Sequence, residues 1–199
     1  MPRPRQFDEP ALLDAAIELF WTRGYAGTSI EDVARATTVG NGSIYAAYQS
    51  KNGLYLTAVT RYCRRLTDMV RAAMTGRTGD VATSMREYLE LIICDCISQP
   101  GRRGCLMLNS LTLLDRVPEL RTVIDRTTRG LQALLEERLL RDLDGDPGPV
   151  DVAALSAHYV TLSQGLIQRS RLGHAPDELR AIADAAVRDT ALALARAAS

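Results

Sequence analysis

The chain has 199 residues, and its 24 basic and 24 acidic side chains give a formal net charge of zero. A hydrophobic fraction of 46% and a charged fraction of 24% exclude a wholly disordered chain, and the length suits one or two small globular domains. No apolar run reaches the roughly 20 residues of a membrane span, and residues 1–10 lack the apolar core of a signal peptide, so we expect a cytoplasmic protein.

Two helices with clear start signals are predicted at the beginning of the chain. The first starts at the N-cap residue Asp8, continues through Pro10 in its first turn and stops at Gly24. The second is short and follows Thr28, because residues 28–31 (Thr-Ser-Ile-Glu) have the pattern of a capping box.

A third short helix and a fourth, longer one are predicted next. Thr37 and Thr38 interrupt the helical pattern, and the third helix spans about Val39–Tyr45. Ser50 is placed to cap the fourth helix, which extends to about Ala73.

The rest of the chain predicts long helices only. A linker at residues 76–79 precedes them, and residues 144–149 form a loop rich in Asp, Gly and Pro. The predicted helices are about Val81–Ser98, Gly104–Leu114, Glu119–Leu143, Asp151–Leu172 and Pro176–Ala198. Since no alternating strand pattern occurs, the fold class is all-α.

The second and third helices have the layout of a helix-turn-helix DNA reader. Residues 40–43 (Gly-Asn-Gly-Ser) are small or polar, which lets a helix approach the major groove, and Asn41 can both donate and accept at base edges. Tyr45 and Lys51 are long enough to reach DNA phosphates. The alternatives are a solvated turn at 40–43 and a core position for Tyr45.

Positive charge is concentrated in the same part of the chain. Residues 33–67 include five basic side chains and no Asp or Glu. Arg61, Arg64 and Arg65 form either a solvated helix face or a source of salt-sensitive attraction to DNA.

Residues 8–55 resemble the DNA-binding domain of the tetracycline-repressor (TetR) family. Residues 28–34 match the second helix of that family, residues 39–45 match its turn and recognition helix, and Tyr48, Ser50 and Lys51 match the start of its fourth helix. The resemblance implies a DNA-binding domain at 1–55 and a ligand-binding and dimerisation domain at 56–199.

The resemblance also implies a function. We expect a dimeric regulator, most often a repressor, that binds a palindromic double-stranded operator and is released by a hydrophobic small-molecule effector. The residues expected to contact DNA are Thr28, Gly40, Asn41, Gly42, Ser43, Tyr45 and Lys51. The residues expected to line a ligand pocket are Tyr88, Ile92, Cys96, Asn109, Leu113, His158 and Leu162. The residues expected at the dimer interface are Leu155, Tyr159, Leu166, Val187, Ala191 and Leu194.

Several alternatives stay open at this point. The second half can form a closed core without a pocket, which would make the regulator constitutive. Cys105 follows two arginines near a predicted helix start, a setting that lowers a thiol pKa, so a thiol-based sensor is possible beside a plain buried cysteine. A small helical enzyme or carrier is the alternative outside DNA binding, but no catalytic set, metal cluster or phosphate loop supports it, and we expect no cofactor.

Overall fold

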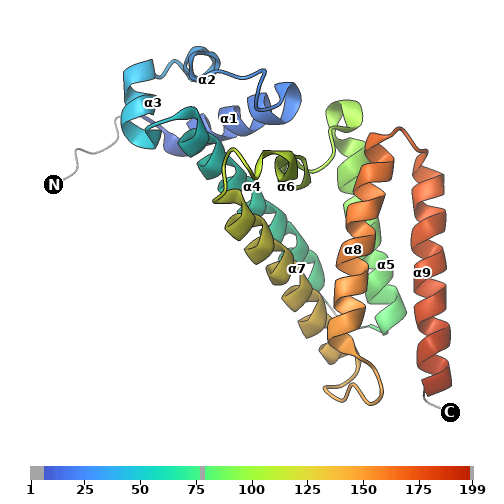
Figure 1. Ribbon diagram of the computed structural model, residues 1–199. Helices are drawn as coiled ribbons and strands as arrows, with labels where there is room; N and C mark the ends of the chain where they lie inside the picture. The colour runs from blue at the N-terminus through green and yellow to red at the C-terminus, as the bar shows by residue number, and fades with distance from the viewer. Residues whose placement is uncertain (1–6, 77–78, 198–199) are drawn as a thin grey trace.

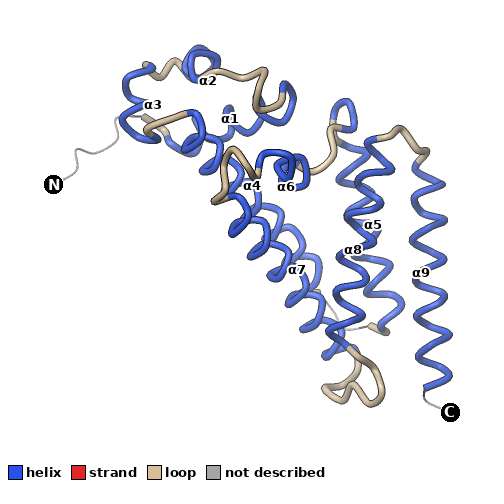
Figure 2. Tube along the Cα trace, viewed as in Figure 1, coloured by secondary structure: helices blue, strands red, loops and turns tan. Residues whose placement is uncertain are grey.

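A computed structural model describes residues 7–76 and 79–197, which form α-helices and two short 3-10 turns without any strand (Figures 1 and 2). This confirms the all-α prediction. The elements are α1 (Glu9–Arg23), α2 (Ile30–Thr37), α3 (Asn41–Tyr48), α4 (Lys51–Met74), α5 (Val81–Ser98), η1 (Pro100–Arg102), α6 (Leu106–Asn109), η2 (Ser110–Leu113), α7 (Leu120–Asp142), α8 (Val152–Arg171) and α9 (Pro176–Ala197). Within the same residues, none of the helices combines the length and the apolar character needed to cross a bilayer.

The helices are arranged in two parts that share α4 (Figure 1). The head consists of α1 to α3 packed on the first half of α4. The bundle consists of α5, α7, α8 and α9 with the second half of α4, and α7 runs beside α4. The buried residues of α6 join the core of the head, although α6 follows α5 in the chain. Helix α4 and the α6 segment therefore connect the two parts.

Most helices begin at a side chain that accepts a hydrogen bond from a free backbone N–H. Asp8, Ser50, Asp80 and Asp151 cap α1, α4, α5 and α8 in this way. Such caps satisfy backbone donors that have no partner inside the helix. The helix starts predicted at Asp8 and Ser50 are therefore confirmed. They could be predicted because capping depends on a few neighbouring residues.

The cap of α2 lies one residue later than predicted. Ser29, not Thr28, is the N-cap, and its capping-box partner is Asp32 rather than Glu31. The Thr28 hydroxyl instead donates to main-chain oxygens of α1 and the turn after it, at 3.1 and 2.9 Å. The prediction was wrong because adjacent Thr and Ser residues are both capable caps.

The bounds of two other predicted helices also change. Helix α3 begins at Asn41, since Gly40 is its N-cap, and it continues to Tyr48, whose ring is buried in the head. The glycines therefore lie at the start of α3 and do not weaken its interior. The helix predicted over Gly104–Leu114 is shorter, because Gly104 has a φ of 72° and the chain tightens into a 3-10 turn at Ser110.

Candidate DNA-binding surface

Helix α3 presents small and polar groups to solvent. Asn41, Gly42 and Ser43 are exposed, while Ile44 is buried in the head. A Cβ added to Gly40 or Gly42 would meet no atom within 4 Å apart from its chain neighbours and the backbone of its own helix, so the start of this helix is not covered by other side chains. A bare helix face of this kind can approach another surface closely, as reading a major groove requires.

Tyr45 lies on the same exposed side of α3. Its side chain is 46% exposed, which contradicts the alternative that it packs in the core. Tyr45 and Lys51 border a hollow of about 400 Å³ together with residues 26–32. The first turn of α2 opens into this hollow, and the N-terminus of a helix carries partial positive charge. A phenol, an ammonium group and a helix N-terminus therefore face one space.

Lys51 is held in place by an aromatic ring. Its Nζ lies 4.3 Å from the centre of the Tyr25 ring. Burial lowers the pKa of Lys51, the nearby Arg116 lowers it further, and Asp32 acts in the opposite direction. Tyr25 and Arg116 were absent from the predicted site, because no motif marks an aromatic residue in a loop or an arginine 65 positions away.

Thr28 does not contribute a side chain to this surface. It borders the hollow but is only 1% exposed, and its hydroxyl is bonded to Leu19 and Gly24 carbonyl oxygens. The expectation that the Thr28 side chain contacts DNA is therefore wrong.

The basic segment predicted from the sequence is partly neutralised by acids from other segments. Arg61 and Arg65 both pair with Asp14 at 2.7 Å, and the hydrogen bond from Arg61 is the main reason why the pKa of Asp14 is lowered. Arg35 pairs with Asp32 at 3.2 Å. Attraction to DNA from Arg61 and Arg65 is thus weaker than the sequence suggests, since the acid that faces them lies in α1.

The predicted ligand residues do not surround one space. Tyr88 is fully buried and donates to Ser163 Oγ at 2.9 Å, and Ile92 and Cys96 belong to the bundle core. The burial of these three residues agrees with the alternative that this part of the bundle is a closed core without a pocket. The other four predicted ligand residues lie in two other parts of the molecule.

Asn109 and Leu113 lie at the α6 segment, beside the head. The Asn109 amide donates to the Arg103 carbonyl oxygen at 3.0 Å, and its oxygen accepts from Arg171 at 2.7 Å. Asn109 was expected to line a ligand pocket, but its amide nitrogen and oxygen both have partners within the protein.

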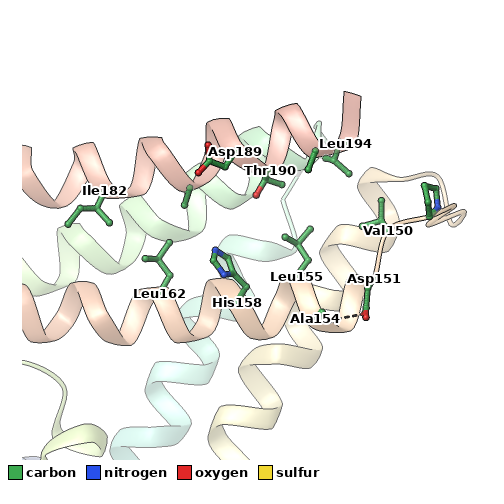
Figure 3. A pocket seen from close by; sticks show the side chains of 13 residues that line it. Val150, Asp151, Ala154, Leu155, His158, Leu162, Ile182, Asp189, Thr190 and Leu194 are labelled. Carbon is green, nitrogen blue, oxygen red and sulfur yellow. Dashed lines mark hydrogen bonds between the residues drawn. The ribbon is translucent and has the colours of Figure 1, made fainter. Parts of the chain in front are cut away.

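His158 and Leu162 line a different feature, a groove between α8 and α9 of about 630 Å³ (Figure 3). Figure 3 shows His158, Leu155 and Leu162 projecting from α8 towards Ile182 and Leu194 of α9. His158 is exposed, so it does not pack in the bundle core. Two predicted interface residues, Leu155 and Leu194, border this groove.

Three other predicted interface residues face the wrong way for contact between subunits. Tyr159, Leu166 and Val187 are buried within the protomer, whereas Ala191 is exposed. The Tyr159 hydroxyl is 2.8 Å from Thr190 Oγ1. Helices α8 and α9 both pack on α5, so their most regular apolar stripe faces inward. Helical periodicity shows that a stripe exists but not which neighbour covers it.

The thiol of Cys105 is not activated. It is buried, the Tyr62 hydroxyl donates to its sulfur at 3.4 Å, and burial raises its pKa. The helix that follows has only four residues, so its dipole is small. The expectation of a lowered thiol pKa, which supported a sensor at Cys105, is therefore wrong.

Cys94 should be the first cysteine to react with iodoacetamide in the folded protein. It is exposed, although its bond to Glu90 raises its pKa, whereas Cys105 is shielded. Mass spectrometry of briefly treated protein should find the label on Cys94, and labelling of Cys105 should require denaturant. Equal labelling of Cys105 and Cys94 in the native protein would contradict this account of the buried thiol.

Comparison with known proteins gives consistent similarities. Residues 12–58 match the family described as bacterial regulatory proteins, tetR family. The chain is 30% identical over 192 residues to the HTH-type transcriptional repressor ComR of Escherichia coli K12, covering 94% of this chain and 90% of ComR. It is 29% identical to the HTH-type transcriptional regulator YezE of Bacillus subtilis 168, over 82% of this chain and 86% of YezE.

A solved structure has the same helix arrangement. A cysteine mutant of the TetR family transcriptional regulator CifR, complexed with 26-bp double-strand operator DNA, matches with a TM-score of 0.79 at 28% identity. The match covers 94% of this chain and 98% of the CifR chain. The likeness therefore extends over both the head and the bundle.

Proposed function

Because this chain belongs to the TetR family of bacterial transcriptional regulators, we propose that it binds an inverted-repeat operator as a homodimer and represses transcription until a small molecule releases it. The chain is a DNA-binding regulator and not an enzyme. The observation that carries the proposal is the bare, exposed face of α3 beside the hollow bordered by Tyr45 and Lys51. A bacterial regulator must share a compartment with the DNA that it binds, so we propose a cytoplasmic location.

The two kinds of DNA contact come from different parts of this surface. Asn41 and Ser43 lie on the exposed side of α3 and reach base edges in the major groove, and the glycines beside them let the backbone come close. Tyr45 and Lys51 bind the phosphate backbone, which fixes the register of the helix without reading sequence. Gly40, Gly42 and these four side chains are the DNA-binding residues we retain.

The groove between α8 and α9 supports dimerisation. Its lining is mainly apolar, with Leu155, Leu162 and Leu194 among its residues, and a second copy can cover it by two-fold symmetry. Ala154, which lines the groove, and Gly165 are both exposed on α8, and their small size allows close helix packing. A dimer of this kind places its recognition helices about 34–36 Å apart, one turn of DNA.

Release by an effector requires a second site and a connection. A hollow of about 350 Å³ lies among α6, η2, α7 and α8, with Leu108, Leu111, Leu114 and Ile124 in its lining and Arg121 and Gln164 beside them. We assign a hydrophobic effector with a polar group to this hollow, in place of the pocket expected from the sequence. A typical coupling of about 1–3 kcal/mol between the sites changes operator affinity by about 5–150-fold.

Helix α4 is the connection between effector and operator. Its first residue, Lys51, borders the DNA-facing hollow, and the carbonyl oxygen of Met74 at its end accepts hydrogen bonds from Arg138 and Arg141 of α7. An effector that favours a different angle of α4 shifts the population of DNA-competent dimers. The linker predicted at 76–79 lies in part outside the described residues.

Two substitutions should separate sequence reading from phosphate binding. Asn41→Ala should cost about 1–3 kcal/mol at one base pair of each half-site and leave affinity for random duplex nearly unchanged. Lys51→Gln should weaken specific and random DNA alike and reduce the salt dependence of binding. Fluorescence anisotropy with both duplexes over a range of salt concentrations measures the two effects. If Asn41→Ala weakened random and specific binding equally, the assignment of α3 as the reading helix would fail.

A further inference from the structure

One tyrosine ring lies close to two positively charged side chains that are far apart in the sequence. Tyr25 lies in the turn between α1 and α2, and Lys51 Nζ is 4.3 Å from the centre of its ring. The guanidinium carbon of Arg116 is 5.3 Å from the same centre. Arg116 belongs to the loop between η2 and α7, which is far from the DNA-binding motif in sequence. The ring thus lies between the first residue of α4 and the loop before α7.

Asn52 fixes this arrangement through two hydrogen bonds. Its side-chain oxygen accepts from the Tyr25 hydroxyl, and its amide donates to the carbonyl oxygen of Arg116 at 3.2 Å. The Tyr25 ring also packs edge-on against Tyr55, with ring centres 5.1 Å apart. Arg116 is therefore held near Lys51 by its own backbone and not only by a flexible side chain.

Among the described residues, neither Lys51 nor Arg116 forms an ion pair at this position. In the part of the chain that the structure describes, no hydrogen bond or ion pair joins either side-chain cation to a carboxylate. Asp32 is the acid that raises the pKa of Lys51, but its carboxylate already accepts hydrogen bonds from Ser29 and from Arg35. The face of the Tyr25 ring offsets only part of the repulsion between like charges. An anion bound between Lys51 and Arg116 would remove the remaining repulsion.

The DNA backbone is an anion of suitable position and charge. Lys51 borders the hollow next to the exposed face of α3, so a phosphate bound there lies within reach of this edge of the head. Arg116 is exposed and carries the planar guanidinium group that binds phosphate with two parallel hydrogen bonds.

We propose that Lys51 and Arg116 together bind the phosphate backbone of DNA, so that the loop before α7 contributes a DNA contact from outside the helix-turn-helix. This inference rests on the proposed DNA-binding function. It has a consequence for regulation, because a shift of the loop removes a positive charge from the DNA surface without any movement of α3. Operator affinity then depends directly on the position of a segment that also borders the proposed effector hollow.

The first test compares salt dependence for Arg116→Gln with that of the unchanged protein, using a random-sequence duplex because phosphate contacts do not need an operator. Loss of one phosphate contact per protomer should reduce the slope of log affinity against log salt by about 0.9 per protomer, and affinity at low salt should fall. Arg116→Lys should keep most of the slope. The matched control is Arg126→Gln, which removes an exposed arginine from α7 itself. An Arg116→Gln variant with the slope and affinity of the unchanged protein would overturn the proposal.

A second readout does not depend on DNA. Lys51 is the sole lysine of the sequence, so reductive methylation with ¹³C-formaldehyde labels it and the N-terminal amine alone. Because Arg116 lowers the pKa of Lys51, the labelled lysine should titrate at higher pH in Arg116→Gln than in the unchanged protein. An identical titration would show that the two charges do not interact, and would overturn the proposal. If the unchanged protein bound no DNA, the proposed function would fail, and a shifted titration would still show that the cation pair exists.

Discussion

Leu162→Asp should convert the protein to a monomer and weaken operator binding by about 10³-fold or more. Leu162 lines the groove between α8 and α9, which we propose is covered by the second subunit. An aspartate there would have to lose its hydration in an apolar interface, at a cost that the interface cannot offset. A monomer reads one half-site only, and so it loses the second set of base contacts that separates specific from non-specific binding.

Light scattering and operator binding on the same samples measure this effect. The matched control is Leu140→Asp, because Leu140 is an exposed leucine of α7 that does not line the groove. The control should remain dimeric with unchanged affinity. A Leu162→Asp protein that is still dimeric and still binds its operator would show that the subunits associate through another surface.

Arg138→Ala should lower the free energy of unfolding by about 3–5 kcal/mol, the range for breaking a buried ion pair. The side chains of Arg138 and Asp142 are 1% and 0% exposed, and the Arg138 Nε lies 3.2 Å from Asp142 Oδ1. Arg138 also donates to the Met74 carbonyl oxygen at 3.3 Å, where α4 ends. Removal of the arginine leaves a buried carboxylate without its principal partner and loosens the end of α4.

Urea denaturation monitored by circular dichroism gives the unfolding free energy. Arg129→Ala is the matched control, since Arg129 forms an exposed pair with Asp125 and its loss should cost about 0.3–0.5 kcal/mol. The double variant Arg138→Met with Asp142→Leu should lose less stability than Arg138→Ala, because it leaves no unpaired buried charge. If Arg138→Ala lowered the free energy of unfolding no more than Arg129→Ala, the Arg138–Asp142 pair would not stabilise the fold at the end of α4 as described.

Local features of this fold were predictable from the sequence, and contacts between distant segments were not. The N-caps at Asp8 and Ser50 depend on a few neighbouring residues, so the sequence predicts α1 and α4 closely. The pairing of Arg61 with Asp14 joins residues 47 positions apart, and nothing in the local pattern of either residue announces it. An acid-free segment of sequence therefore did not correspond to an acid-free surface.

The candidate site divides in the same way. The exposed positions of α3 follow from the helix-turn-helix pattern, and only Thr28 proved to have a buried side chain. The predicted ligand residues follow from apolar stripes on helices, and such stripes occur both where two helices enclose a pocket and where they pack into a closed core. Tyr88 illustrates this, because its hydroxyl is bonded to Ser163 inside a packed core. Arg116 reaches the DNA-facing part of the molecule only through the fold.

Selection of bound duplexes from a random DNA pool tests the central claim most directly. The experiment is run with the full chain at about 0.15 M salt, where non-specific electrostatic binding is weakened. A homodimer with the proposed reading helices predicts an inverted repeat whose half-sites are centred about one helical turn apart. Recovery of no enriched sequence by folded, dimeric protein would contradict the account that α3 reads DNA.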